Sequence, residues 1–315
     1  MVIKIDQTKF TMVEFIMYHY VRDLQNSKFP KIKGLDFSDF VTQIKFLKKK
    51  YRVISIEDFI NNNFSKNDKN CVLTFDDGYI DHYDFVFPTL LKENIKGSFF
   101  TPVDTVKENK LLDVNLIHII LASEKEDKIF ERINYHFQKI DSLNKLSKYI
   151  GEINTKSRYD TKTTIVIKRL LQTVLPLNIR SEICRLLLED FVEEDEISLS
   201  KSLYMSQTQI KEMISNGMHF GSHGKSHFWF SSLDKTEQEK EILSSINFLD
   251  SLYDKDHVLT MCYPYGDFNE DTLSLLKKYN FKLALTTIPN TYNKENHNLF
   301  EIPRWDTNDY YPKKN

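Results

Sequence analysis

The chain has 315 residues, of which 41% are hydrophobic and 28% are charged, and its formal net charge is −2. These values are typical of a soluble globular protein and allow one large domain or two small ones. Because the charge is near zero and Lys and Arg are spread along the chain, a nucleic-acid-binding face is excluded as the main functional surface.

Three features of the sequence bear on the compartment. No stretch of eighteen or more apolar residues occurs, so no transmembrane segment is expected. The first residues, MVIKIDQTKF, carry charges where a secretory signal needs an apolar run. The cysteines at 71, 184 and 262 are far apart and odd in number, which favours a reducing compartment without disulfides. We therefore expect a cytoplasmic protein.

The first hundred residues predict alternating strands and helices. Residues 13–20 are an apolar run typical of a buried strand. Apolar residues at helical spacing predict a helix from Phe37 to Leu47, capped by Asp36 or Ser38. The elements expected next are a strand at 52–55, a helix beginning at Ile56, a polar loop at 61–70, a strand at 71–75, a helix at 84–94 and a strand at 96–102.

The stretch 104–200 breaks this rhythm, because its apolar spacing is helical and strand patterns are rare. We expect a helical insertion between two strands of a main domain formed by residues 1–103 and 201–315. The sequence does not decide whether the insertion is a lid, a dimer contact or a substrate wall. The elements expected after it are a helix ending at Gly217, strands at 218–223, 257–266, 281–287 and 300–305, and helices at 234–253 and 269–280. The alternation predicts an α/β fold in which crossover helices connect parallel strands.

Two adjacent carboxylates end the predicted strand at 71–75, within the segment TFDDGY (74–79). Because side chains alternate along a strand, Asp76 and Asp77 point in different directions, so one can bind a metal while the other faces a substrate. Parallel α/β folds build their sites at the carboxyl ends of strands. A helix N-cap with a solvated second carboxylate is the alternative interpretation.

Two histidines follow the predicted strand at 218–223, within the segment SHGKSH (222–227). His223 and His227 are separated by three residues, and neutral imidazoles at this spacing can converge on one divalent ion. Catalytic zinc sites commonly use two His and one carboxylate and keep a position open for water. Asp77 or Asp76 supplies that carboxylate. Two surface histidines are the alternative.

A third segment, YPYG (263–266), ends the predicted strand at 257–266. The rings of Tyr263 and Tyr265, on either side of Pro264, suit stacking on sugars, and Gly266 permits a turn. A backbone N–H of this loop can donate to an oxyanion. An ordinary turn with packed aromatic side chains is the alternative.

The three segments, in this order and at predicted strand ends, resemble the motifs of the polysaccharide deacetylase family (NodB homology domain, carbohydrate esterase family four). The resemblance covers about residues 13–101 and 206–306. It implies a distorted (β/α) barrel in which Asp76 is the general base. The metal ligands that it implies are Asp77, His223 and His227. Zn²⁺ is the first candidate for the metal, with Ni²⁺, Co²⁺ and Fe²⁺ as alternatives.

The segment MYHYV at 17–21 resembles circularly permuted members of the family, whose general-acid His precedes the first motif; by that resemblance His19 is the acid. The family's third motif usually carries an Arg that pairs with the base, but Cys262 occupies that position here. Arg304 is a candidate replacement, and Trp305 is a candidate wall of the acyl pocket. A core histidine at 19 and a packed core Trp at 305 are the alternatives.

The resemblance implies a hydrolase of carbon–nitrogen bonds other than peptide bonds, an N-deacetylase acting on an amino sugar. Without a secretion signal we expect a nucleotide-linked or lipid-linked amino sugar, or a surface-glycan intermediate, as its partner. One alternative is a hydrolase of a formamide or cyclic imide on the same metal site. Another is a non-catalytic carbohydrate-binding protein that kept the fold, for which the missing Arg at Cys262 is the main support.

Overall fold

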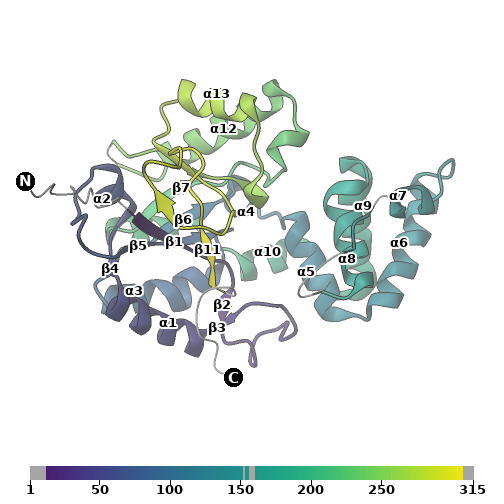
Figure 1. Cartoon of the computed structure of the whole chain (residues 1–315). Coiled ribbons are helices and arrows are strands. Elements are labelled where there is room, and N and C mark those ends of the chain that lie inside the picture. The colour runs from purple at the N-terminus through teal and green to yellow at the C-terminus, as the bar shows by residue number, and fades with distance from the viewer. Residues whose placement is uncertain (1–11, 152, 156–159, 255, 308–315) are drawn as a thin grey trace, which may run out of the picture. The chain divides into compact units, whose positions relative to one another are not determined.

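The computed structural model describes residues 12–151, 153–155, 160–254 and 256–307, and the chain divides into two units (Figure 1). The first unit contains the chain up to residue 23, residues 34–108 and the chain from residue 203 onwards. The second contains residues 24–33 and 109–202. The second unit corresponds to the predicted insertion, but it begins after residue 108 rather than 103 and includes ten residues from the N-terminal part.

The first unit contains all the strands of the described chain. The strands are β1 (Met12–Tyr18), β2 (Val21–Arg22), β3 (Leu35–Asp36), β4 (Arg52–Val53), β5 (Asn70–Asp76), β6 (Ser98–Thr101), β7 (His219–Ser222), β8 (Thr260–Cys262), β9 (Leu283–Leu285), β10 (Tyr292–Asn293) and β11 (Trp305–Asp306). The helices are α1 (Phe37–Lys50), α2 (Ile56–Ile60), the π-helix η1 (His82–Val86), α3 (Phe87–Lys92), α4 (Val103–Lys107), α11 (Gln207–Ser215), the 3₁₀ helix η3 (Phe230–Ser232), α12 (Lys235–Asp250), the 3₁₀ helix η4 (Pro264–Gly266) and α13 (Glu270–Lys278).

The main sheet has the order β10-β1-β5-β6-β7-β8-β9, and β4 and β11 add to β5 and β1. All its strand pairs are parallel except β1 with β10. Crossover helices connect the parallel strands, which confirms the predicted α/β class. The element bounds differ mainly at the C-terminal strands, which are shorter than predicted, and at η1, where a π-turn precedes Pro88 and its missing N–H.

The strand side chains divide between two faces with period two, as expected for a sheet buried on both sides. On β5, Leu73 and Phe75 belong to the core cluster that also contains apolar residues of α1, α3, α11 and α12. Val72 belongs to a second cluster with Phe15, Phe100 and residues of β8 and β9. Asp76 has the parity of Val72, so it lies on the face that carries the second cluster.

The segment 302–306 bridges the two outer strands of this parallel arrangement. Ile302 pairs with Leu285 of β9, and Trp305 pairs with Ile16 of β1. The curled sheet is therefore joined by this short segment rather than by direct pairing of β9 with β1. Arg304 lies in the middle of the segment and is fully buried.

The register brings the carboxyl ends of the strands together. Asp76 pairs with Phe100, Thr101 pairs with Ser222, and Ser222 pairs with Met261. The segments that follow β5, β7 and β8 therefore begin at the same edge of the sheet. These are the three segments that the sequence analysis identified.

The second unit is helical, as predicted for the insertion. Its helices are α5 (Asp113–Ser123), α6 (Glu126–Ile140), α7 (Ser147–Ile150), α8 (Lys162–Arg169), the π-helix η2 (Leu170–Val174), α9 (Leu177–Phe191) and most of α10 (Glu196–Leu203). Its core is apolar, with Ile117, Ile133, Phe137, Ile183 and Leu187 buried where α5, α6 and α9 pack on one another.

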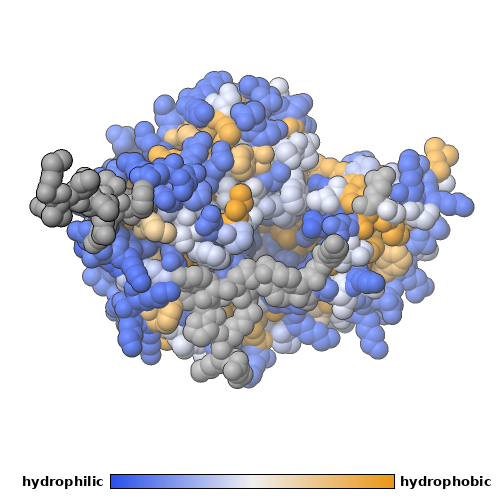
Figure 2. All heavy atoms as spheres, in the orientation of Figure 1, coloured by the Kyte–Doolittle hydropathy of each residue, from blue (hydrophilic) through white to orange (hydrophobic). Residues whose placement is uncertain are grey.

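The surface is mainly polar on the face that Figure 2 shows, where hydrophilic side chains predominate and apolar ones lie in separate groups. Among the described residues, Leu143, Ile197 and Ile288 are large apolar side chains that are exposed. Within the part of the chain that the structure describes, no helix is both long enough and apolar enough to cross a bilayer.

Candidate metal-binding and catalytic site

A buried ion pair connects Asp76 at the end of β5 to Arg304. The Arg304 Nη1 and Nη2 atoms donate to Asp76 Oδ1 at 2.9 Å and Oδ2 at 2.7 Å. Nη1 also donates to the Thr74 hydroxyl at 3.1 Å, and Nε donates to the Thr286 carbonyl at 2.8 Å. The guanidinium is thus held in the two-pronged geometry that suits a carboxylate.

This pair determines the charge of Asp76. Burial raises the pKa of the Asp76 carboxyl, but the Arg304 guanidinium outweighs burial and lowers that pKa to about 2. Asp76 is therefore a carboxylate throughout the neutral range. The structure places Arg304 against the predicted base, the position that the sequence analysis proposed for it in place of a cation at Cys262.

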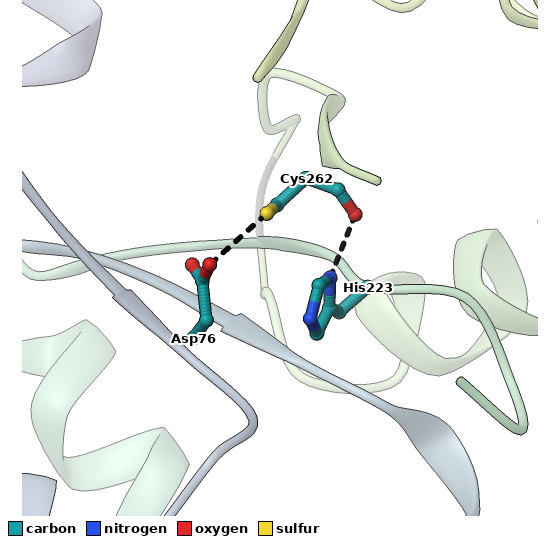
Figure 3. Close-up of side chains that lie close together, drawn as sticks. All are labelled: Asp76, His223 and Cys262. Carbon is teal, nitrogen blue, oxygen red and sulfur yellow. Dashed lines mark hydrogen bonds between the residues drawn. The ribbon is translucent and has the colours of Figure 1, made fainter. Parts of the chain in front are cut away.

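The Cys262 side chain lies in the same cluster (Figure 3). Its Sγ atom is 3.3 Å from Asp76 Oδ2 and 3.0 Å from Arg304 Nη2. Burial raises the pKa of this thiol, so it stays protonated and donates to the carboxylate. Residue 262 thus carries a small neutral side chain, and the guanidinium beside Asp76 belongs to Arg304, in another segment of the chain.

The second carboxylate, Asp77, faces two imidazoles. Its backbone φ is +73°, and its Oδ1 atom lies 3.3 Å from Nε2 of both His223 and His227. Oδ1 is buried and accepts no hydrogen bond, whereas Oδ2 accepts one from the Tyr79 hydroxyl at 2.7 Å. One carboxylate oxygen and two ring nitrogens therefore converge, as the ligands of one cation do.

The protonation of His223 fits this role. Its Nδ1 atom is 2.7 Å from the Cys262 carbonyl oxygen (Figure 3). Because a carbonyl only accepts, Nδ1 carries a proton, and Nε2 is the ring nitrogen that faces Asp77 and is available as a metal ligand. The set of Asp77, His223 and His227 can hold a divalent ion by one oxygen and two nitrogens, which leaves positions open for water.

A second group of Asp76, His223 and Cys262 also has its donor atoms close together. It suits a cation less well, because both oxygens of Asp76 accept from Arg304 and the Cys262 thiol keeps its proton. Because the two groups share His223, only one of them can use it to bind an ion. The set of Asp77, His223 and His227 is therefore the candidate metal site.

The loop between the two histidines is held by a buried carboxylate that the sequence analysis missed. Glu241 of α12 accepts from the backbone N–H of Lys225 at 2.7 Å and of Ser226 at 2.8 Å. The Ser226 hydroxyl donates to the buried Asp104 at 2.7 Å. These contacts hold His227 at a φ of +57°. A Glu in an otherwise ordinary amphipathic helix carries no local signal of this role.

His19 follows β1 and reaches the other side of the base. Its Nε2 atom is 3.9 Å from Asp76 Oδ2, and its side chain is 40% exposed. At this distance the two groups make no direct hydrogen bond. The structure thus brings the predicted acid and the predicted base together and leaves the imidazole accessible to solvent.

The third motif fits its prediction only in part. Tyr263 is buried, stacks on Phe268 and donates to the Phe300 carbonyl at 3.0 Å, so its ring has no exposed face for a sugar. The prediction of Tyr263 as a stacking residue is therefore wrong: the aromatic ring serves the core. Pro264 is also buried. Gly266 is required by the turn, because its φ is +72° and a Cβ atom would come within 2.3 Å of Thr287 Oγ1.

Tyr265 instead takes part in an aromatic pair beside the candidate metal site. Its ring stacks on Trp229 with centroids 4.4 Å apart and contacts the His227 ring edge-on at 4.7 Å. Both aromatic rings are partly exposed. The sequence analysis missed Trp229, although its position two residues after His227 was a usable signal. Trp305, on β11, is partly buried, and its indole N–H donates to the Thr291 hydroxyl at 3.2 Å; its predicted role as a wall of the acyl pocket stays a prediction.

Comparison with known proteins bears on this site. A family model described as polysaccharide deacetylase matches residues 186–284, a span that contains SHGKSH and YPYG but not TFDDGY. A curated relative from Bacillus subtilis (strain 168), "Putative polysaccharide deacetylase YxkH", is 26% identical over 98 residues, 31% of this chain and 35% of that protein. The matched region spans about a third of that relative's length.

Solved structures with a similar fold cover almost the whole chain. The Streptococcus pyogenes deacetylase PplD in complex with acetate has 18% identity and a TM-score of 0.55, over 94% of this chain and 92% of that one. IcaB from Ammonifex degensii has 16% identity and a TM-score of 0.54, with the same coverage. At identities this low the similarity shows the fold alone. These structures confirm the predicted deacetylase-type α/β fold.

The contacts of Glu241 predict that it supports metal binding from outside the ligand set. Glu241→Ala leaves two partly buried N–H groups without this acceptor, so we expect Zn²⁺ affinity, measured by calorimetric titration, to fall about 10–100-fold. Glu239→Ala is the matched control on the same helix, because Glu239 contacts Lys278 and Tyr279. Equal affinities for the two variants would contradict the role.

Proposed function

We propose that this chain is a polysaccharide deacetylase, a metal-dependent N-deacetylase that removes the acetyl group of an amino sugar in a glycan or glycan precursor, and its similarity to that family supports the proposal. The observation that carries the proposal is the convergence of Asp77, His223 and His227 next to an Asp76 that is paired with a buried cation. A carbohydrate-binding module needs neither group. The pairing of Arg304 with Asp76 also removes the main argument for a non-catalytic protein.

The donor set of one carboxylate and two imidazoles supports Zn²⁺ first, with Ni²⁺, Co²⁺ or Fe²⁺ as alternatives. When bound, such an ion polarises a carbonyl and lowers the pKa of a coordinated water towards about 7. His223 and His227 hold it through Nε2, and Asp77 holds it through Oδ1. The Tyr79 hydroxyl binds the other Asp77 oxygen and keeps Oδ1 aimed at the imidazoles.

Asp76 is the group that accepts a proton from the attacking water. The Arg304 contacts occupy one lone pair on each carboxylate oxygen, and the Cys262 thiol approaches Oδ2, so Oδ1 retains acceptor capacity. His19, 3.9 Å from Asp76 and accessible, donates a proton to the departing nitrogen. The backbone N–H of Tyr265 is the proposed donor to the oxyanion. Each proton transfer contributes about 10²–10⁴ in rate.

An amino sugar is favoured as the substrate by the aromatic pair beside His227. The rings of Trp229 and Tyr265 offer partly exposed aromatic surface within reach of the ligand set, and the apolar face of a pyranose suits such surface. A formamide or cyclic imide needs no such surface. Turnover of N-acetylhexosamine oligomers compared with simple amides distinguishes these substrates, and nucleotide-linked and lipid-linked N-acetylhexosamines form further arms. Cytoplasmic location stays a prediction from the sequence.

The assignment separates metal binding from proton transfer. Asp76→Asn removes the base and keeps the ligand set, so we expect unchanged zinc content by elemental analysis and a loss of turnover of at least 10²-fold. His223→Ala removes a metal ligand, so we expect loss of both zinc content and turnover. An Asp76→Asn variant with full activity would refute the base, and a His223→Ala variant with full zinc would refute the site.

Arg304 determines where the acid side of the pH–rate profile falls. Its guanidinium counteracts burial and keeps the pKa of Asp76 at about 2. Arg304→Met removes the largest contribution that opposes burial, so the pKa of Asp76 rises and the acid limb of kcat/KM moves to higher pH. Arg304→Lys keeps a cation and moves the limb less. An acid limb in the same place for both variants and the unmodified chain would show that Arg304 does not act on the base.

A further inference from the structure

His82 lies outside the three motifs and contacts the segment that carries the proposed acid. It is the first residue of η1 and is fully buried. Its ring lies among the rings of Phe75, Tyr79 and Phe99, with centroids 5.6–5.7 Å away. Its Nε2 atom lies 2.8 Å from the backbone carbonyl oxygen of His19. A polar ring in this apolar setting therefore directs one nitrogen at the residue that bears the acid.

The chemistry of this contact assigns the proton. A carbonyl oxygen only accepts, so Nε2 of His82 carries the hydrogen and donates it to His19. Burial lowers the pKa of His82 to about 4, so the ring is neutral at working pH and holds that single proton. The remaining nitrogen, Nδ1, is buried and makes no hydrogen bond. The hydrogen bond from Nε2 to the His19 carbonyl is thus the polar contact of the His82 imidazole among the described residues.

Two neighbouring contacts tie the same segments together. Arg22 Nε donates to Asp81 Oδ2 at 2.7 Å in a buried ion pair, and the rings of Tyr20 and Tyr79 stack with centroids 4.0 Å apart. Residues 19–22 are therefore attached to residues 79–82 by at least three contacts. The His19 ring itself is 40% exposed and 3.9 Å from Asp76, so its placement depends on its backbone.

We propose that His82 is a positioning residue for proton donation: its Nε2–H holds the His19 carbonyl and thereby sets the imidazole of His19 at its distance from Asp76. This inference rests on the proposed function, because it assumes that His19 protonates a departing nitrogen. Small displacements of a catalytic group reduce the rate strongly, so loss of this one hydrogen bond is measurable.

Three substitutions in the full-length, zinc-loaded protein test the role of the donor. H82F fills the cavity without a donor, H82N has a donor one bond too short to reach, and H82Q places an amide nitrogen at the reach of Nε2. Each is assayed on an N-acetylhexosamine oligomer and on 4-nitrophenyl acetate, whose phenolate leaves without a proton. H19A serves as the reference for complete loss of the acid.

We expect H82F and H82N to lose at least about tenfold in kcat on the N-acetyl sugar, within the loss of about 10²–10⁴ expected for H19A. Ester turnover stays within about twofold, and H82Q restores sugar turnover to within about threefold. A merely structural role would reduce both activities together. The matched control is H257F, because His257 stacks on Tyr253 before the amino end of β8 and its loss creates no such difference.

Equal losses on both substrates, or no loss on the sugar in whichever donor-lacking variant folds, would overturn the inference. If the unmodified chain hydrolyses the ester but no N-acetyl sugar, the proposed function fails instead. The inference is then decided by the crystal structure of H82N: a changed distance from His19 Nε2 to Asp76 Oδ2 supports it, and an unchanged distance refutes it.

Discussion

The buried ion pair between Asp76 and Arg304 is the interaction on which the rest of the site depends. Two charges removed from water destabilise a fold unless each is fully hydrogen-bonded, and removal of one partner leaves the other uncompensated. Here Arg304 Nη1 donates to the Thr74 hydroxyl as well as to Asp76, and Nε donates to the Thr286 carbonyl. The segment that brings Arg304 to Asp76 also bridges β9 and β1. Closure of the sheet and ionisation of Asp76, the proposed base, therefore depend on the same contacts.

Two adjacent carboxylates acquire different chemistry from their surroundings. Asp76 belongs to the strand and faces a guanidinium and a thiol, whereas Asp77 lies just beyond the strand with a positive φ and faces two imidazoles. Neighbouring acids whose environments differ in this way take different roles, as in other hydrolytic sites with paired carboxylates. The turn after β5 is what separates the proposed proton acceptor from the proposed metal ligand.

Residues outside the motifs hold this geometry. Glu241 binds the loop between the histidines, Tyr79 orients Asp77, and His82 binds the backbone of His19. Each is buried: Glu241 and His82 contact backbone groups of site segments distant in the chain, and Tyr79 contacts the side chain of the nearby Asp77. A precise arrangement of exposed and reactive groups thus rests on buried polar contacts, whose loss leaves unsatisfied donors or acceptors.

The sequence by itself determined the alternation of strands and helices, the helical character of most of residues 104–200, and the placement of TFDDGY and SHGKSH at strand ends. These features can be predicted because hydrophobic periodicity is a local pattern in the sequence. The meeting of parallel strand ends at one edge follows from the topology of the fold. Tertiary structure alone decided that Arg304 contacts an acid 228 residues earlier, that Tyr263 lies in the core while Tyr265 pairs with Trp229, and that residues 24–33 join the helical unit. An aromatic or charged side chain has the same local signature in a core as in a site, and only long-range packing determines which of the two it occupies.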